Sequence, residues 1–297
     1  MPGTIPSGVL IRRTFSSLAL WSVVLALVLS GSGLFSQISC WAIITVFGLL
    51  GQWEFYLAQR EKGLRVYKKW GVFCGLLLFL NSLWFLILKP NVAYSWVGVS
   101  AIIVLSIIGV LVRMVLGRPK LDTPIVTVAL SVMGVIYVPY LFNYVCRVSF
   151  WPGHPEATKY ALIYLLAVTK FADVGAFVVG SLVGRNKMCP HISPGKTWEG
   201  FVGGILSSLG MSLLILWLCP GKVCGLDYVD GLILGLLLSV ASTVGDLAES
   251  VVKRDAAIKD SGHTIPGIGG ILDLIDSILF TAPVLYFYLY FFNSFQS

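Results

Sequence analysis

The chain has 297 residues, of which 57% are hydrophobic and only 12% are charged. A soluble domain carries roughly 25% charged residues, so this composition excludes a soluble protein and indicates one integral membrane domain over residues 1–297. The net charge of +7 comes from Lys and Arg residues that sit between apolar runs and form no dense basic block, so a nucleic-acid partner is not expected.

Several apolar stretches are long enough to cross a bilayer, which takes roughly 20 residues in a helix. In chain order they cover residues 15–34, 38–58, 70–88, 93–117, 123–146, 159–184, 200–219, 229–252 and 271–293. The sequence therefore predicts an all-α polytopic membrane protein with about nine transmembrane helices.

The charges of the connecting segments predict the orientation of these helices. If the N-terminus is cytoplasmic, most of the 21 Lys and Arg residues fall in cytoplasmic segments and few fall on the opposite side. Cytoplasmic loops of membrane proteins carry this excess of basic residues. We therefore expect the N-terminus to be cytoplasmic and the C-terminus to lie on the other side.

The two halves of the chain differ in polar content. Residues 1–150 are expected to form N-terminal helices that serve mainly as scaffold, and residues 159–293 are expected to form the catalytic helices and cytoplasmic loops. The basic segment 59–70 could contact anionic lipid headgroups, although orientation alone explains its charge equally well.

Polar chemistry begins in the sixth span. Lys170 and Asp173 are three residues apart and share a helix face, either as a buried pair or, as we favour, with Asp173 facing a polar cavity. The following loop offers Ser193, Lys196 and Thr197 near the start of the seventh span, where backbone N–H groups favour phosphate. A plain turn with a helix cap is the alternative for this loop.

The last two spans carry polar stripes at helical spacing. The stripe on the eighth span consists of Ser242, Asp246, Glu249 and Lys253. The ninth span begins with Asp273 and Asp276, which also share a face. Carboxylates that converge from two helices make a hard-cation site of the kind Mg²⁺ prefers. The predicted metal ligands are Asp246, Asp273 and Asp276.

Between these stripes lies a basic, glycine-rich segment. Its cations are expected to meet phosphate oxygens and are Lys253, Arg254 and Lys259. The segment 267–270 holds three glycines, which permit close backbone approach. The competing interpretation is a juxtamembrane loop whose acids and bases only pair with each other, but the acids continue into the span at Asp273 and Asp276.

The order of these motifs resembles the phosphatidate cytidylyltransferase family, also called CDP-diacylglycerol synthases, over about residues 170–280. The matching motifs are Asp173-x-Gly175-Ala176-Phe177, Ser193-Pro194-x-Lys196-Thr197-x-Glu199-Gly200, Ser250-x-x-Lys253-Arg254-x₄-Lys259-Asp260-x-Gly262, and Pro266 followed by Gly269-Gly270-x-x-Asp273-x-x-Asp276. Two positions depart from the family pattern: Ile268 stands where the family often has His, and Leu274 where it often has Arg. Roles of that His and Arg are therefore in doubt here.

The resemblance implies a nucleotidyltransferase of phospholipid biosynthesis that converts CTP and phosphatidate into CDP-diacylglycerol and pyrophosphate. The implied cofactor is Mg²⁺, with a second cation such as K⁺ allowed. The catalytic residues would be Asp246, Lys253, Asp273 and Asp276. The substrate-binding residues would be Asp173, Ser193, Lys196, Thr197, Arg254, Lys259, Asp260, Gly269 and Gly270.

Two other functions compete with this one. A CTP-dependent lipid-alcohol kinase would use the same metal and nucleotide groups but release CDP. A cation-coupled transporter is less favoured, because the polar groups gather at one face of the membrane. The expected partners are CTP, phosphatidate and membrane lipids, with a homo-oligomer allowed. The expected location is a bacterial inner membrane, with the active site on the cytoplasmic face.

Overall fold

The computed structural model describes residues 33–117, 124–150, 155–256 and 270–293. Within them, 8 helices are long and apolar enough to cross a membrane. This confirms the all-α polytopic fold, and each helix coincides with a predicted span to within a few residues. The first predicted span, residues 15–34, lies almost entirely outside the described residues.

The first four described spans come from the N-terminal half of the chain. They are α2 (Leu34–Glu61), α3 (Lys68–Ser82) continued by η1 (Leu83–Leu88), α4 (Val92–Gly117), and α5 (Pro124–Val135) continued by η2 (Ile136–Tyr140) and α6 (Leu141–Ser149). Pro139 lies inside η2. Because proline has no N–H to donate to the preceding turn, the helix widens locally into a π segment at this point.

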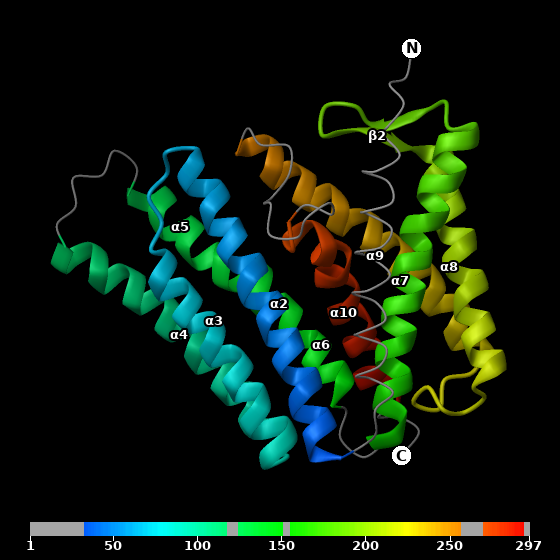
Figure 1. The fold of residues 1–297 in the computed structure, drawn as a ribbon, viewed down its shortest axis with the longest axis horizontal. Coiled ribbons are helices and arrows are strands. Elements are labelled where there is room, and N and C mark those ends of the chain that lie inside the picture. The colour runs from blue at the N-terminus through cyan, green and yellow to red at the C-terminus, as the bar shows by residue number, and fades with distance from the viewer. Residues whose placement is uncertain (1–32, 118–123, 151–154, 257–269, 294–297) are drawn as a thin grey trace.

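The last four spans come from the C-terminal half. They are α7 (Pro155–Val183), α8 (Trp198–Leu218), α9 (Tyr228–Asp255) and α10 (Leu272–Asn293). In Figure 1, α2 to α6 lie on one side, α7 and α8 on the other, and α10 between them. α10 contacts α2, α6, α7 and α9 and is the most enclosed of the described spans, so its polar residues are positioned from both halves of the chain.

A small antiparallel hairpin joins α7 to α8. It consists of β1 (Lys187–Cys189) and β2 (Ser193–Thr197), and the sequence did not predict it. Thr197 ends the hairpin and caps α8, because its Oγ1 accepts a hydrogen bond of 3.1 Å from the N–H of Gly200. The helix cap of the alternative interpretation is therefore present, and β2 places its side chains at the end of the bundle beside α9.

The polar connections gather at one end of the bundle. The α2–α3 connection, the β1–β2 hairpin and the C-terminal end of α9 all lie at the top of Figure 1, whereas the α8–α9 connection lies at the opposite end. This arrangement agrees with the alternation of loops that the charge pattern predicts. Which end faces the cytoplasm remains a prediction.

Close contact between α9 and α10 depends on a glycine. A Cβ atom added to Gly245 would lie 2.7 Å from the carbonyl oxygen of Asp276 and 3.1 Å from Cα of Ser277. Both distances are shorter than ordinary van der Waals contacts, so a side chain here would push the helices apart. Gly245 therefore sets the spacing of the two helices that carry Asp246, Glu249, Asp273 and Asp276.

Candidate active site

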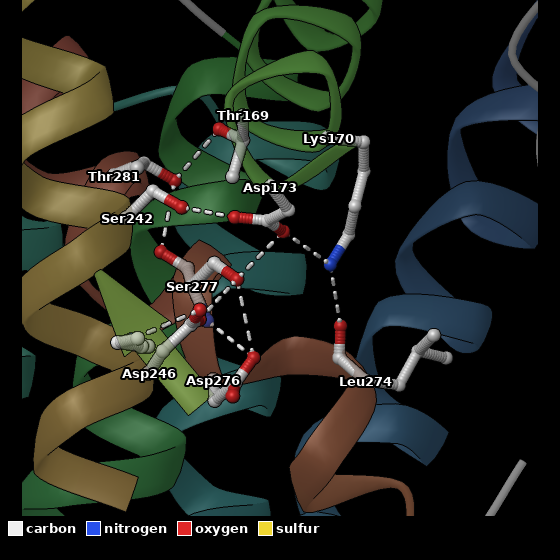
Figure 2. Close-up of polar contacts among 10 residues, drawn as sticks. Thr169, Lys170, Asp173, Ser242, Asp246, Leu274, Asp276, Ser277 and Thr281 are labelled. Atoms are coloured by element: carbon white, nitrogen blue, oxygen red, sulfur yellow. Dashed lines mark hydrogen bonds and ion pairs between the residues drawn. The ribbon is translucent and has the colours of Figure 1, made fainter. Parts of the chain in front are cut away.

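Three carboxylates converge on one hydroxyl group at the junction of α7, α9 and α10. The Oγ atom of Ser277 lies 3.0 Å from Asp173 Oδ2, 2.9 Å from Asp246 Oδ1 and 3.2 Å from Asp276 Oδ1. Figure 2 shows these side chains pointing toward one another from the three helices. A hydroxyl has a single hydrogen to donate, so it can satisfy only one of the three carboxylates at a time. The cluster therefore concentrates negative charge that calls for a cation.

Asp173 is held in place by its neighbours. Ser242 on α9 donates a short hydrogen bond to Asp173 Oδ1, and the ammonium group of Lys170 lies 3.3 Å from Asp173 Oδ2. The same ammonium donates to the carbonyl oxygen of Leu274 at 3.2 Å, which ties α7 to the first turns of α10 (Figure 2). The Lys170–Asp173 pair, which was the alternative interpretation of these two residues, is thus present, and Lys170 also links two helices.

The hairpin brings a second lysine to the cluster. Lys196 Nζ on β2 lies 3.2 Å from Asp246 Oδ2 and donates to the carbonyl oxygen of Thr243 at 3.1 Å. Because Lys196 comes from a segment outside the helical bundle, this contact closes the hairpin over α9. It places a cation next to the acidic centre on the side of the loops.

A second polar group surrounds Lys253, near the end of α9. Its ammonium lies 2.6 Å from Glu249 Oε2 and 3.0 Å from Asp273 Oδ1. The other carboxylate oxygen of Asp273 accepts a hydrogen bond of 3.0 Å from the N–H of Gly270. Glu249 is 2% exposed, so it is a buried carboxyl group paired directly with Lys253. Asp273 therefore belongs to this lysine-centred group.

The N-terminus of α10 is held by a carboxylate from the N-terminal half of the chain. Glu54 on α2 is 2% exposed, and its Oε2 accepts a hydrogen bond of 2.8 Å from the N–H of Leu272. The first N–H groups of a helix have no partner within the helix, and the helix dipole favours a negative charge there. Glu54 therefore orients the turn that carries Asp273 and Asp276.

A cavity of about 470 Å³ opens beside the acidic cluster. Its polar lining includes Asp173, Asp246, Lys196 and Thr197, and its apolar lining includes Phe177. Phe177 lies on the outer surface of α7, where it is 75% exposed. The cavity therefore connects the charged centre with the apolar surface of the bundle, as we expected for Asp173.

The carboxylates of the cluster suit a divalent cation chemically. Among the described residues, no group of three His, Cys, Asp or Glu side chains is arranged to hold a metal ion. Carboxylate oxygens are the ligands that Mg²⁺ prefers, and Asp173, Asp246 and Asp276 share one hydrogen donor in Ser277. Of the three predicted metal ligands, the structure brings Asp246 and Asp276 together and leaves Asp273 beside Lys253.

Other predicted site residues lie around this centre. Ser193 and Lys196 line the cavity, and Thr197 lines it while capping α8. Arg254 donates from Nε to the carbonyl oxygen of Ile192 at 3.2 Å and so fixes α9 to the hairpin. Three predicted residues lie outside the described part of the chain, namely Lys259, Asp260 and Gly269.

The sequence did not assign roles to several members of the site. They are Glu54, Lys170, Ser242, Glu249 and Ser277. Ser242 and Glu249 lie on the predicted stripe, so the helical spacing contained a signal for them. Ser277 directly follows Asp276 and carries no spacing signal of its own. Glu54 is an acid within an apolar span, which is itself an indication of function.

Comparison with known proteins identifies the class. The sequence model of the cytidylyltransferase family matches residues 11–292, so the chain belongs to the cytidylyltransferase family. It is similar to a phosphatidate cytidylyltransferase of Synechocystis sp., with 31% identity over 93% of this chain and 95% of the relative. Proteins of the same name from Staphylococcus haemolyticus and Bacillus subtilis are 34% and 38% identical, over 72% and 54% of this chain and 77% and 58% of each relative.

Proposed function

We propose that this protein is a phosphatidate cytidylyltransferase, which converts CTP and phosphatidate into CDP-diacylglycerol and pyrophosphate. The observation that carries the proposal is the convergence of Asp173, Asp246 and Asp276 next to Lys196, at the end of a membrane bundle. Membership of the cytidylyltransferase family and the relatives of that name support it.

The proposed reaction does not require a general base. A phosphate oxygen of phosphatidate attacks the α-phosphorus of CTP, and the bond from that phosphorus to the oxygen bridging the β-phosphorus breaks. Pyrophosphate leaves with that oxygen. The second pKa of a phosphate monoester is about 6, so near pH 7 the nucleophile is already largely ionised. The protein therefore has to position two polyanions and neutralise their charge.

Two lysines are available to neutralise phosphate charge. In the structure Lys196 pairs with Asp246, and Lys253 pairs with Glu249 and Asp273. A bound phosphate can take over the ammonium group from its carboxylate, because both partners offer anionic oxygens. We expect Lys196 to contact the substrate in the cavity and Lys253 to contact the phosphate groups on the side of α10.

The metal ion belongs to this proposal. Mg²⁺ would be held by Asp246 and Asp276, with Asp273 as the third predicted ligand and K⁺ as a candidate second cation. When bound, the divalent ion supplies charge neutralisation and polarises the phosphoryl oxygens. Asp173 and Ser277 would orient the ligand carboxylates through the hydrogen bonds they already share.

The cavity suits a lipid substrate. Its polar end contains Lys196 and Asp246, and its apolar wall includes Phe177 on the outer surface of α7. A phosphate headgroup could bind at the polar end while its acyl chains stay against the apolar surface. We place the site on the cytoplasmic face of a bacterial inner membrane, where CTP is available, because the basic segments gather at that end of the bundle.

CTP labelled at either of two phosphates distinguishes the proposed cytidylyltransferase activity from that of a lipid kinase. Purified protein is incubated with Mg²⁺, phosphatidate or diacylglycerol, and CTP labelled with ³²P at the α or the γ position. We expect the α label to enter lipid only with phosphatidate, and the γ label to leave in pyrophosphate. Entry of the γ label into lipid, with release of CDP, would identify a kinase instead.

A further inference from the structure

A second cavity lies at the same end of the bundle as the β1–β2 hairpin, between the α2–α3 loop and the first turn of α5. Its volume is about 340 Å³, and its lining includes Arg60, Arg65, Tyr67 and Thr127. It shares no lining residue with the cavity beside the acidic cluster. The catalytic proposal therefore gives it no role.

The charge of this cavity comes from guanidinium groups. Arg60 and Arg65 line it, and none of the described residues that line it is acidic. Two neighbouring lysines make contacts elsewhere, since Lys62 lies 2.6 Å from Asp255 and Lys68 lies over an aromatic ring. A planar guanidinium can donate two parallel hydrogen bonds to a phosphate, which an ammonium cannot do. The guanidinium groups of this cavity are therefore suited to bind a phosphate group.

The backbone around the cavity adds to this preference. Thr127 lies near the N-terminus of α5, where the helix dipole favours an anion. Gly63 adopts a φ of +83°, a left-handed conformation that favours glycine, and so lets the loop turn back toward α5. The loop and the helix end therefore face the same hollow.

Charge asymmetry alone does not account for this arrangement. Basic residues that only orient a membrane protein need to lie on the cytoplasmic side, with no requirement for a shared concave site. Here two arginines and a helix start line one cavity, at the level where lipid headgroups meet the ends of the spans.

We propose that this cavity binds the phosphate group of an anionic phospholipid headgroup. The chemistry it recognises is a phosphate ester with net negative charge, which free phosphate shares in part. The inference does not depend on the proposed enzymatic function, because it concerns a different cavity and a binding event without chemistry.

The test is a binding titration of the full chain in neutral detergent, read by native mass spectrometry. The probes are phosphatidylglycerol, phosphatidylcholine and inorganic phosphate. The variant Arg60→Ala/Arg65→Ala removes both cations, and the control Lys69→Ala/Arg113→Ala removes two exposed cations that do not line the cavity. The variant Arg60→Lys/Arg65→Lys keeps both charges but cannot donate two parallel hydrogen bonds from one side chain. It replaces the alanine variant in the test if the alanine variant fails to fold.

We expect wild type to bind phosphatidylglycerol more tightly than phosphatidylcholine. Since each basic residue near an anionic headgroup contributes roughly a factor of five, the double arginine variant should bind about thirtyfold more weakly. The control should change by less than about threefold, and the lysine variant should lie in between. Displacement by inorganic phosphate would show that the phosphate alone is recognised, and no displacement would show that the lipid is required.

Three results would overturn the proposal. One is equal affinity of wild type and both arginine variants for phosphatidylglycerol. Another is equal weakening in the alanine variant and its control, which would indicate diffuse surface charge. The third is binding of phosphatidylcholine as tight as that of phosphatidylglycerol.

Discussion

At the scale of single residues, the centre of the site is short of hydrogen-bond donors. Ser277 offers one hydrogen to Asp173, Asp246 and Asp276, and Lys170 and Lys196 each approach the cluster from its edge. Buried carboxylates that repel one another are costly unless a cation or proton joins them. The cluster is therefore built for a charged ligand, and its flanking lysines are the groups that a phosphate can recruit.

Lys196→Gln tests the role of the hairpin lysine. The side chain stays polar and is one bond shorter, and it loses the charge that pairs with Asp246. Losing a hydrogen bond from a charged donor costs about 1.5–3 kcal/mol, so kcat/KM should fall by about ten- to a hundredfold. Steady-state kinetics with CTP and phosphatidate varied in turn checks this. An unchanged kcat/KM for both substrates would show that Lys196 does not contact either phosphate.

At the scale of elements, the position of α10 decides the geometry of the site. Its N-terminus is held by Glu54 from α2, and its approach to α9 is set by Gly245. Both contacts join segments that are far apart in the sequence. The N-terminal helices therefore help to position Asp273 and Asp276 and are more than a passive scaffold.

Glu54→Ala and Glu54→Gln separate charge from hydrogen bonding at the start of α10. Glutamine keeps an acceptor for the N–H of Leu272, whereas alanine leaves that buried group without this partner. An unsatisfied buried donor costs about 1–3 kcal/mol, so alanine should lower both the unfolding temperature and kcat, with glutamine in between. The unfolding temperature and kcat are both measured. If alanine behaved like wild type in both, Glu54 would have no positioning role.

Gly245→Val tests the close approach of α9 and α10. A side chain at this position meets the backbone of Asp276, so we expect a loss of about 1–3 kcal/mol in unfolding free energy, as for overpacked cores, together with a loss of activity. Gly210→Val on α8 is the matched control, because nothing lies within 4 Å of a Cβ at that position. Equal stability and activity in the two variants would contradict the close-packed interface.

At the scale of the whole molecule, the polar connections at one end of the bundle are expected to face the cytoplasm. Cys189 lies on the hairpin at that end, and Cys219 lies in the α8–α9 connection at the other. Both thiols are partly exposed. A thiol reagent that cannot cross the membrane therefore tests the predicted orientation, because it reaches only the thiol on its own side.

Single-cysteine variants of the otherwise cysteine-free chain test this orientation. In inside-out vesicles we expect a charged maleimide to label Cys189 and to spare Cys219, and in right-side-out vesicles the reverse. A third single-cysteine variant, which keeps only Cys224, is the reference, because burial raises the pKa of its thiol to about 11. Since the thiolate reacts, labelling of Cys224 should be slow at pH 7 and faster as the pH rises. The opposite pattern for Cys189 and Cys219 would reverse the topology.

Much of this architecture could be predicted from local sequence patterns. The apolar lengths predicted the described spans, and helical spacing placed Glu249 next to Lys253. Spacing on one helix, however, carries no information on which stripes face each other. It could not separate Asp273 from the cluster around Ser277, or reveal that Glu54 bonds to Leu272 across 218 positions. Those contacts follow from packing of distant helices.

One measurement tests the central claim most directly: transfer of label from α-³²P-CTP to phosphatidate across a range of Mg²⁺ concentrations. It compares wild type, Asp276→Asn, and Glu61→Gln as a carboxylate control that is exposed and lies outside the site. We predict that Asp276→Asn lowers transfer by at least about a hundredfold, as expected when a group that stabilises phosphoryl charge is lost. Glu61→Gln should stay within about twofold of wild type. A folded Asp276→Asn variant with normal transfer and unchanged Mg²⁺ dependence would contradict the assignment of this cluster as the catalytic centre.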